Sequence, residues 1–136
     1  ARCMRAALND AKINASDIAY INAHGTSTPV GDKNETVAIN NTFMSSISDL
    51  LISSTKSMTG HLLGGAGGLE SVFTVLSVFN DVVPPTINLD FPDEECNLDY
   101  CANEARDKKI NFALKNNFGF GGTNGSLIFK KIGVDL

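Results

Sequence analysis

Residues 18–29 read Ile-Ala-Tyr-Ile-Asn-Ala-His-Gly-Thr-Ser-Thr-Pro. The first four form a short apolar run, typical of a buried parallel strand, and the polar residues that follow include His24. The pattern returns further along, where residues 50–54 predict a second strand and a Ser/Thr-rich turn leads to His61. A helical pattern follows each turn. Two rounds of strand, polar turn and helix indicate an α/β fold.

Three helices and a hairpin complete the predicted order of elements. Apolar residues at helical spacing predict helices over residues 1–13, 32–43 and 62–79. The second helix is expected to begin with a capping-box-like pair, Asp32 and Glu35, and to pack Val37, Ile39 and Phe43 on its neighbours. Strand-like runs at 110–117 and 126–132 flank a glycine-rich turn and predict a closing hairpin. The chain is expected to be irregular from residue 80, with an extended polyproline-like path at 83–86 and no regular element through residue 107.

Composition limits the size of the unit and the classes of partner. A chain of 136 residues, 43% hydrophobic, with a formal net charge of −4, suits one α/β unit at most. An acidic balance provides no basic field for nucleic acid or anionic lipid. The longest apolar run, residues 69–79, is interrupted by polar side chains and is too short to cross a bilayer, so no membrane span is expected. A helical pattern that starts at residue 1 without a cap residue indicates a fragment of a longer polypeptide.

The two histidines occupy matching positions in the two rounds of the pattern. Ligands of open α/β sheets gather beyond the carboxyl ends of the strands, and both His24 and His61 follow a predicted strand. A single histidine in such a turn is more often an ordinary turn residue. Two in equivalent places favour a site, because their imidazoles converge if the strands are neighbours.

Lys56 and Glu70 are the charged residues expected to support the histidines. Lys56 lies five positions before His61, and Glu70 stands on a predicted helix flanked by Leu69 and Val72. A buried carboxylate needs a partner, and Lys56 is the nearest cation in sequence. We therefore expect a Lys56–Glu70 ion pair; the alternative is that Glu70 lies on a solvated helix edge.

Two glycine-rich runs and three cysteines complete the set of candidate motifs. Residues 64–68 lack the spacing of either phosphate-binding glycine motif, so we interpret them as a site of close packing. The run 118–124 predicts an aromatic gate or a turn with exposed amides, against an ordinary hairpin turn with two core rings. Cys3, Cys96 and Cys101 match neither a disulfide framework nor a zinc motif, and none follows a strand and opens a helix as a nucleophile would.

Three motifs in fixed order carry a family resemblance that spans nearly the whole chain. They are Asn22–Pro29, Ser54–His61 and Asn117–Asn124, with Val-Pro-Pro-Thr-Ile-Asn at residues 83–88 between the last two. Together they resemble the β-ketoacyl-acyl carrier protein synthases, most closely those of type II fatty acid synthesis. The resemblance implies the thiolase-like fold, in which two similar α/β halves form one site. Residues 1–136 would form most of the C-terminal half, a mixed sheet with packed helices, without the N-terminal half that carries the nucleophilic cysteine.

The resemblance assigns roles to the four candidate site residues. His24 and His61 correspond to the two catalytic histidines of a Cys-His-His site, Lys56 to the supporting lysine, and Glu70 to its buried carboxylate neighbour. No metal site is implied.

It also implies contacts with the substrate. Thr26 and Thr28 match the pair that binds the phosphopantetheine arm, and Phe118 and Phe120 match the aromatic gate of the acyl pocket. One departure from the family pattern is Asn117, where relatives usually carry a small residue such as Ser.

The implied activity is decarboxylative Claisen condensation of acyl groups with malonyl-acyl carrier protein in fatty acid elongation. Substrates travel on the phosphopantetheine of the acyl carrier protein, so no cofactor of the chain's own is expected. The expected partners are that carrier protein, the missing N-terminal half and, when complete, a second copy in a homodimer. The expected location is the cytoplasm or an organelle of bacterial ancestry, a plastid or mitochondrion. The fragment alone is expected not to turn over.

Three other functions remain open. A non-catalytic subunit that sets chain length has no use for His24, Lys56 and His61 together, which argues against it. A polyketide ketosynthase differs only in substrate. A metal-binding module using His24, His61 and Cys101 is the weakest alternative.

Overall fold

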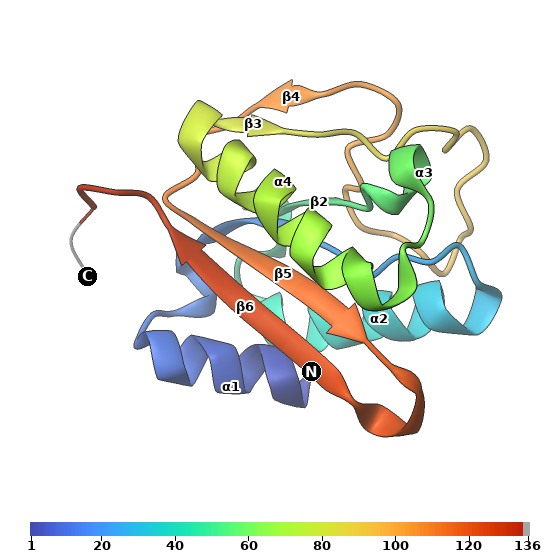
Figure 1. Cartoon of the computed structure of the whole chain (residues 1–136), viewed down its shortest axis with the longest axis horizontal. Helices are drawn as coiled ribbons and strands as arrows, with labels where there is room; N and C mark the ends of the chain where they lie inside the picture. The colour runs from blue at the N-terminus through green and yellow to red at the C-terminus, as the bar shows by residue number, and fades with distance from the viewer. Residues whose placement is uncertain (135–136) are drawn as a thin grey trace.

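The central sheet is built from the predicted strands, but not in their order along the chain. The computed structural model describes residues 1–134. Within them the main sheet consists of β1 (Ile18–Asn22), β2 (Leu51–Ser53), β5 (Phe112–Phe118) and β6 (Asn124–Lys130). The spatial order is β2-β1-β5-β6 (Figure 1). β1 pairs in parallel with β2 and with β5, and β5 pairs antiparallel with β6. The expected mixed sheet and the closing hairpin are confirmed.

Helices cover both faces of this sheet (Figure 1). They are α1 (Arg2–Ala11), α2 (Pro29–Phe43), the single-turn α3 (Lys56–Thr59) and α4 (Ala66–Asn80). α1 and α2 lie on one face, where Met4 and Phe43 are fully buried against strand residues such as Ile21. α4 lies on the other face, where Val78 packs with Ala113. Burial of apolar side chains on both faces holds the layers together.

The start of α2 differs from the prediction. The helix begins at Pro29, whose fixed φ suits a first helical position, and its cap residue Thr28 makes no side-chain cap bond. The expected capping box is wrong, because the Glu35 carboxylate instead binds the backbone amides of the turn after β1. Val37 is 55% exposed, so its expected burial is also wrong, whereas Ile39 and Phe43 are buried as predicted.

Two short strands lie where no regular element was predicted. β3 (Val82–Val83) and β4 (Arg106–Asp107) form a small antiparallel sheet. Strands of two residues carry no measurable alternation, which is why the sequence pattern misses them. Short 3-10 turns occupy η1 (Ala15–Asp17), η2 (Ile47–Asp49), η3 (Leu63–Gly65) and η4 (Phe120–Gly122).

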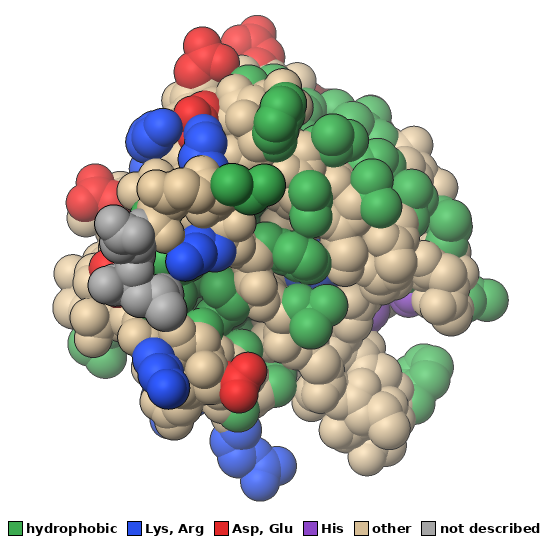
Figure 2. Space-filling view, turned by 60° about the vertical axis from the view of Figure 1, so that its left-hand side comes forward, with side chains coloured by type: hydrophobic (Ala, Val, Ile, Leu, Met, Phe, Trp, Pro, Cys, Tyr) green, Lys and Arg blue, Asp and Glu red, His purple; other side chains and the backbone are tan. Residues whose placement is uncertain are grey.

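On α4 the inward face carries polar side chains and the outward face carries apolar ones, the reverse of the pattern on an ordinary surface helix. Its inward face carries Glu70, Thr74 and Ser77, all buried. Its outward face carries apolar side chains that are about half exposed or more: Val72, Val75, Leu76 and Phe79. Hydrophobic side chains gather on this side of the molecule, and a histidine lies beside a hollow at their lower edge (Figure 2). Among residues 1–134, no helix is long and apolar enough to cross a membrane.

Candidate active site

The two histidines meet beyond the ends of neighbouring parallel strands. His24 lies two residues after β1, and His61 follows β2 and the single turn of α3. Their ring centroids are 5.4 Å apart, and the ring planes are almost perpendicular at 88°. The predicted convergence of the two imidazoles is therefore confirmed.

The turn that carries His24 is held by contacts with β2 and α2. The amides of His24 and Gly25 donate to the two carboxylate oxygens of Glu35, at 3.0 and 2.8 Å. Ser54 Oγ donates to the Gly25 carbonyl at 2.6 Å. Gly25 has a φ of +33°, and a Cβ there would lie 2.6 Å from the Ser54 Cβ. Only glycine fits this position without displacing a neighbour.

The environment of His24 keeps its imidazole neutral. Burial, followed by the positive charges of Lys56 and Lys115 and the nearby His61, lowers the His24 pKa from its ordinary 6.5 to about 4. The ring is therefore uncharged at pH 7. Its Nδ1 is buried and has no hydrogen-bond partner among residues 1–134.

His61 is fixed in one tautomer by its own turn. The amide of Leu63 donates to His61 Nδ1 at 3.0 Å. A nitrogen that accepts a hydrogen bond carries no proton, so the neutral ring holds its proton on Nε2. The side chain is exposed, and this Nε2–H is available to a ligand.

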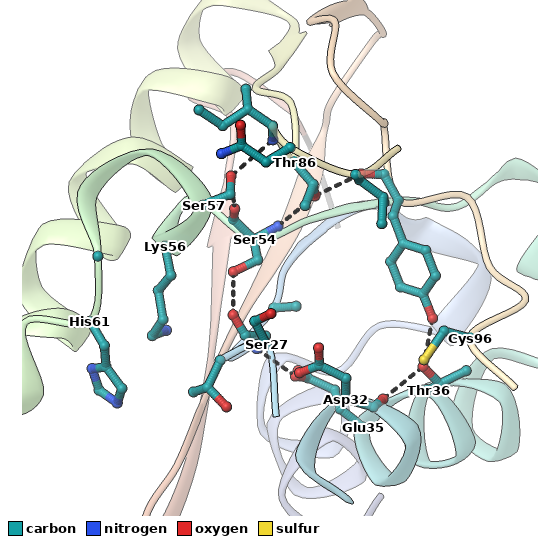
Figure 3. Close-up of a pocket in the computed structure, with 18 of the residues that line it drawn as sticks. Ser27, Asp32, Glu35, Thr36, Ser54, Lys56, Ser57, His61, Thr86 and Cys96 are labelled. Atoms are coloured by element: carbon teal, nitrogen blue, oxygen red, sulfur yellow. Dashed lines mark hydrogen bonds between the residues drawn. The ribbon is translucent and has the colours of Figure 1, made fainter. Parts of the chain in front are cut away.

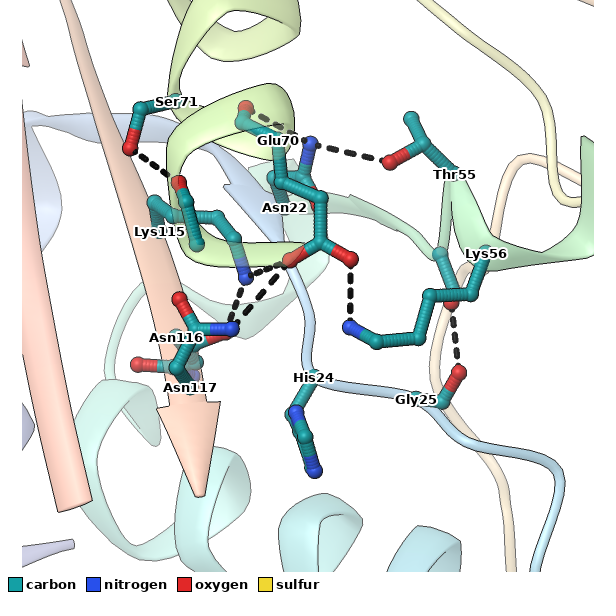
Figure 4. A network of polar contacts seen from close by, with 12 residues as sticks. Asn22, His24, Gly25, Thr55, Lys56, Glu70, Ser71, Lys115, Asn116 and Asn117 are labelled. Atoms are coloured by element: carbon teal, nitrogen blue, oxygen red, sulfur yellow. Dashed lines mark hydrogen bonds and ion pairs between the residues drawn. The ribbon is translucent and has the colours of Figure 1, made fainter. Parts of the chain in front are cut away.

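Behind the histidines lies a buried ion cluster centred on Glu70 (Figure 4). Lys56 Nζ lies 2.5 Å from one Glu70 carboxylate oxygen, and Lys115 Nζ lies 2.7 Å from the other. Burial acts to raise the Glu70 pKa, but Lys115 and Lys56 outweigh it, so the pKa is lowered and the carboxylate stays charged. The predicted Lys56–Glu70 pair is confirmed, and the alternative of a solvated Glu70 is wrong, since the residue is 1% exposed.

Three asparagines complete this network. Asn117 donates to Glu70 at 3.3 Å, Asn116 donates to Glu35 at 3.2 Å, and Asn22 donates to the Glu70 carbonyl at 3.4 Å. Asn117, the departure from the family pattern, thus contacts the cluster directly. Sequence reasoning missed Lys115, Asn116 and Glu35. A lysine inside the apolar run of β5 was the one available signal.

The two gate phenylalanines occupy different environments. The Phe118 ring is 5.8 Å from the His24 ring, centroid to centroid. Phe120 lies in η4. In the described part of the chain its side chain is fully exposed and covers neither His24 nor His61. The alternative of two core rings is therefore wrong. A gating role for either ring stays a prediction.

A cavity of about 380 Å³ adjoins His61 and Lys56 (Figure 3). Its walls come from the His24 turn, α2, α3 and the segment at 86–100, and it is lined by Thr26, Asp32, Ser54, Thr86 and Tyr100 among others. The hydroxyl of Thr26 is hydrogen-bonded to that of Thr28 at 3.0 Å. The two threonines matched to the pantetheine arm therefore lie together, one of them at the cavity wall.

The remaining candidate motifs are the glycine run at the start of α4 and the three cysteines. Among the glycines at the start of α4, Gly67 approaches Asn117 closely, with its Cβ position 3.2 Å from Oδ1, as expected for close packing. Gly64 and Gly68 face open space. All three cysteines are free in the described part of the chain. That part contains no group of three residues able to hold a metal ion, and Cys101 is buried in the core, so the metal-module alternative is not supported.

Comparison with known proteins agrees with this geometry. The family described as "Beta-ketoacyl synthase, C-terminal domain" matches residues 1–90. The 3-oxoacyl-[acyl-carrier-protein] synthase 2 of Staphylococcus aureus (strain COL) is 55% identical over 96% of this chain, and that of Coxiella burnetii is 53% identical over 96%. The chain spans 31% of the length of each of these relatives.

A solved ketosynthase has the same fold. A type II polyketide ketosynthase in complex with its acyl-carrier protein superposes with a TM-score of 0.93 at 41% identity, over 96% of this chain and 32% of that one. The α/β arrangement is thus the thiolase-like one of ketosynthases. With the family match over residues 1–90, it shows that the chain belongs to the β-ketoacyl synthase family.

Proposed function

We propose that this chain forms most of the C-terminal half of a 3-oxoacyl-[acyl-carrier-protein] synthase that condenses acyl groups with malonyl-acyl carrier protein. The observation that carries the proposal is the histidine pair. His24 is kept neutral, and His61 offers an Nε2–H. The centroids of the two rings are 5.4 Å apart. Two neutral imidazoles can donate hydrogen bonds to one oxygen that becomes negatively charged.

The proposed chemistry needs such a pair at one step. An acyl group is first carried as a thioester on a cysteine supplied by the rest of the polypeptide. The bond between the malonyl carboxylate and C2 then breaks, CO2 leaves, and the electron pair moves to the thioester oxygen as an enolate. His24 and His61 would stabilise that oxygen. The enolate carbon attacks the acyl thioester, a carbon–carbon bond forms, and the cysteine leaves as thiolate.

Lys56 supports this step through its charge. Its ammonium lies beside His24 and lowers the His24 pKa, which keeps the imidazole from becoming an imidazolium. Glu70 holds the ammonium in place at 2.5 Å. Removal of Glu70 would leave Lys56 buried without its anion, whereas removal of Lys56 would leave Glu70 with Lys115 alone.

The proposed site of the substrate arm is the cavity at the same edge of the sheet as the histidines. Thr26 and Thr28 present hydroxyls next to the cavity that adjoins His61, which suits the amide groups of a phosphopantetheine arm. A ketosynthase of the same fold has been solved in complex with its acyl-carrier protein. We propose an acyl carrier protein as the partner here, with no cofactor bound by the chain itself.

The outward face of α4 is the proposed contact with the rest of the polypeptide. Exposed Val72, Val75, Leu76 and Phe79 form an apolar strip on a helix whose inward face is polar. Relatives are about three times longer than this chain, so sequence is available to cover the strip. We propose that an N-terminal half packs there, and that the complete protein is a homodimer in the cytoplasm or in an organelle of bacterial ancestry.

The test is malonyl-acyl carrier protein decarboxylation by the complete polypeptide. His24→Ala and His61→Ala should each lower the rate of CO2 release by about 10²–10³-fold, as expected for loss of one oxyanion donor. Near-normal release by either variant would sink the proposal. CO2 release isolates the enolate step from acyl loading of the cysteine.

A polyketide ketosynthase is the second candidate, favoured by the structural match to one at 41% identity. Product analysis separates the two. A fatty acid synthase should release one 3-oxoacyl product per malonyl unit from a saturated acyl primer, whereas a polyketide enzyme extends its own 3-oxo product repeatedly.

A further inference from the structure

Lys115 is a buried cation for which the proposed chemistry gives no role. It lies on β5, on the opposite side of Glu70 from Lys56, and is 1% exposed. Its Nζ contacts Glu70 at 2.7 Å and also donates to the Asn116 carbonyl. Long charged side chains are almost never fully buried unless their charge is matched, so the surroundings of Lys115 must supply anions.

A buried carboxylate supplies the matching charge. Glu70 on α4 pairs directly with both lysines, at 2.5 Å from Lys56 and 2.7 Å from Lys115. Glu35 on α2 is a second buried carboxyl group: burial raises its pKa, while the amides of Gly25 and His24, the Asn116 side chain and the Lys115 charge act to lower it. Without Lys115, one oxygen of the buried Glu70 carboxylate would lose its cation.

Each carboxylate holds one part of the histidine site. Glu70 anchors Lys56, and Glu35 accepts the backbone amides of His24 and Gly25. Asn116 ties the two together, because its carbonyl accepts from Lys115 while its side chain donates to Glu35. Lys115 therefore contacts Glu70 directly and reaches Glu35 through Asn116, and it does not line the cavity.

We propose that Lys115 is a positioning residue of this site: its ammonium pairs with Glu70 and is linked to Glu35 through Asn116, and so keeps the His24 imidazole in place and uncharged. The inference rests on the proposed enolate chemistry and adds a residue to it. Lys115 acts through its neighbours and does not touch the reacting atoms.

The charges around His24 set the direction of the effect. Lys56 on α3 and Lys115 on β5 disfavour the imidazolium, as does His61, while Glu70 on α4 favours it; Glu35 lies on α2 beneath the turn. Removing Lys115 takes away one of the positive charges that disfavour the imidazolium. The His24 pKa should then rise, and its neutral form should be lost at a higher pH than in the wild type.

The experiment compares Lys115→Met with Lys131→Met in the complete polypeptide. Lys131 follows β6 and forms an ion pair with Asp81 at 2.5 Å, so its variant removes a lysine ion pair of the same hairpin away from the histidines. In Lys115→Met, kcat for malonyl decarboxylation should fall about 100-fold, the cost of a small misplacement of catalytic groups. KM should change little, and the acid limb of the pH profile should move to higher pH. Lys131→Met should match the wild type in all three.

An NMR titration of the imidazoles separates this inference from the proposed function. Signals are assigned with His24→Gln and His61→Gln, and the His24 pKa should be higher in Lys115→Met whether or not the enzyme decarboxylates malonyl groups. A normal kcat, or an unchanged His24 titration in a folded Lys115→Met protein, would overturn the inference. Loss of activity in His24→Gln but not in Lys115→Met would leave the proposed function standing and remove the role of Lys115.

Lys115→Arg keeps the test decisive if Lys115→Met does not fold. Burial, opposed by Glu70, lowers the pKa of Lys115 from 10.5 to about 8, whereas an arginine stays charged. Because the positive charge is kept, the His24 pKa of Lys115→Arg should stay close to the wild-type value. A His24 pKa raised in a folded Lys115→Arg protein would contradict the inference.

Discussion

His24 and His61 are held in the site by different means. The His61 ring is oriented by the Leu63 amide, which donates to its Nδ1, a local contact that its own turn provides. His24 has no such bond among the described residues and depends on burial and on two neighbouring lysines. Protonation of His24 is therefore opposed by burial and by the two lysines of the cluster behind it.

This dependence predicts an acid sensitivity carried by one residue. The His24 pKa is about 4 in the folded protein and 6.5 in an ordinary environment, so between these values the unfolded chain binds more protons. The unfolding free energy should therefore fall as pH falls from about 6.5 to about 4. His24→Gln lacks this term and should lose less stability over the same range. Urea denaturation of both proteins at pH 7 and pH 4.5 gives the comparison, and equal losses would refute it.

Glu70 is the residue whose removal should be most costly. Glu70→Gln leaves Lys56 and Lys115 buried without their anion, and breaking a buried pair lowers the unfolding free energy by about 3–5 kcal/mol. Lys33→Met is the matched control, because Lys33 pairs with Asp93 and Glu95 at the surface. The control should change the denaturation midpoint far less. Similar midpoints for the two variants would show that the cluster contributes little.

Side-chain contacts between residues close in sequence could be predicted, whereas contacts between residues far apart in sequence could not. Lys56 and Glu70 stand on neighbouring elements, so burial of one helix face was enough to pair them. Asn116 and Glu35 are 81 positions apart, and their contact depends on β5 lying next to β1. Nothing in the local pattern encodes that neighbour relation, so this half of the cluster was missed.

At the scale of elements, the β1–α2 turn is a tightly constrained segment. Gly25→Ala must hold a positive φ, which costs about 1–2 kcal/mol, and must also displace Ser54, whose Cβ would be 2.6 Å away. His24 directly precedes Gly25, so a shift of this turn would also displace the imidazole. Malonyl decarboxylation should therefore fall together with stability. Gly68→Ala is the control, since Gly68 lies in α4 with no neighbour within 4 Å of its Cβ position.

The control should move stability in the opposite direction. Alanine is favoured over glycine inside a helix by up to about 1 kcal/mol, so Gly68→Ala should raise the melting temperature slightly or leave it unchanged. A Gly25→Ala protein as stable and active as Gly68→Ala would contradict the strained turn. Thermal unfolding and CO2 release on the same samples give both readings.

Elements with a strong apolar period were predictable, and those set by a specific contact were not. α1, β1, β5 and β6 appear where their patterns place them. The predicted start of α2 was wrong because the Glu35 carboxylate does not cap the helix and instead accepts the backbone amide of His24. β3 and β4 were missed because strands of two residues leave no pattern.

For the whole molecule, the inside-out pattern of α4 sets the main prediction. If the rest of the polypeptide covers its outward face, Val72→Asp places a charge inside that contact and should strongly lower the stability of the complete protein. Val37→Asp on α2 is the matched control, because Val37 is 55% exposed and Val72 is 54% exposed in this chain. Equal melting temperatures for the two variants would show that the α4 strip is not covered.

The strand order has a consequence for the chain during its synthesis. β5 lies between β1 and β6 in the sheet but leaves the ribosome more than a hundred residues into this chain. Until then, one edge of β1 has no partner strand, and Glu70 has only one of its two lysines. A nascent or truncated product that stops before residue 112 therefore exposes an apolar strand edge, a template for association with other chains. Completion of β5 is thus the step at which the nascent chain gains both the middle of its sheet and the second cation of Glu70, which makes translational pausing before residue 112 a hazard for the cell's chaperones to manage.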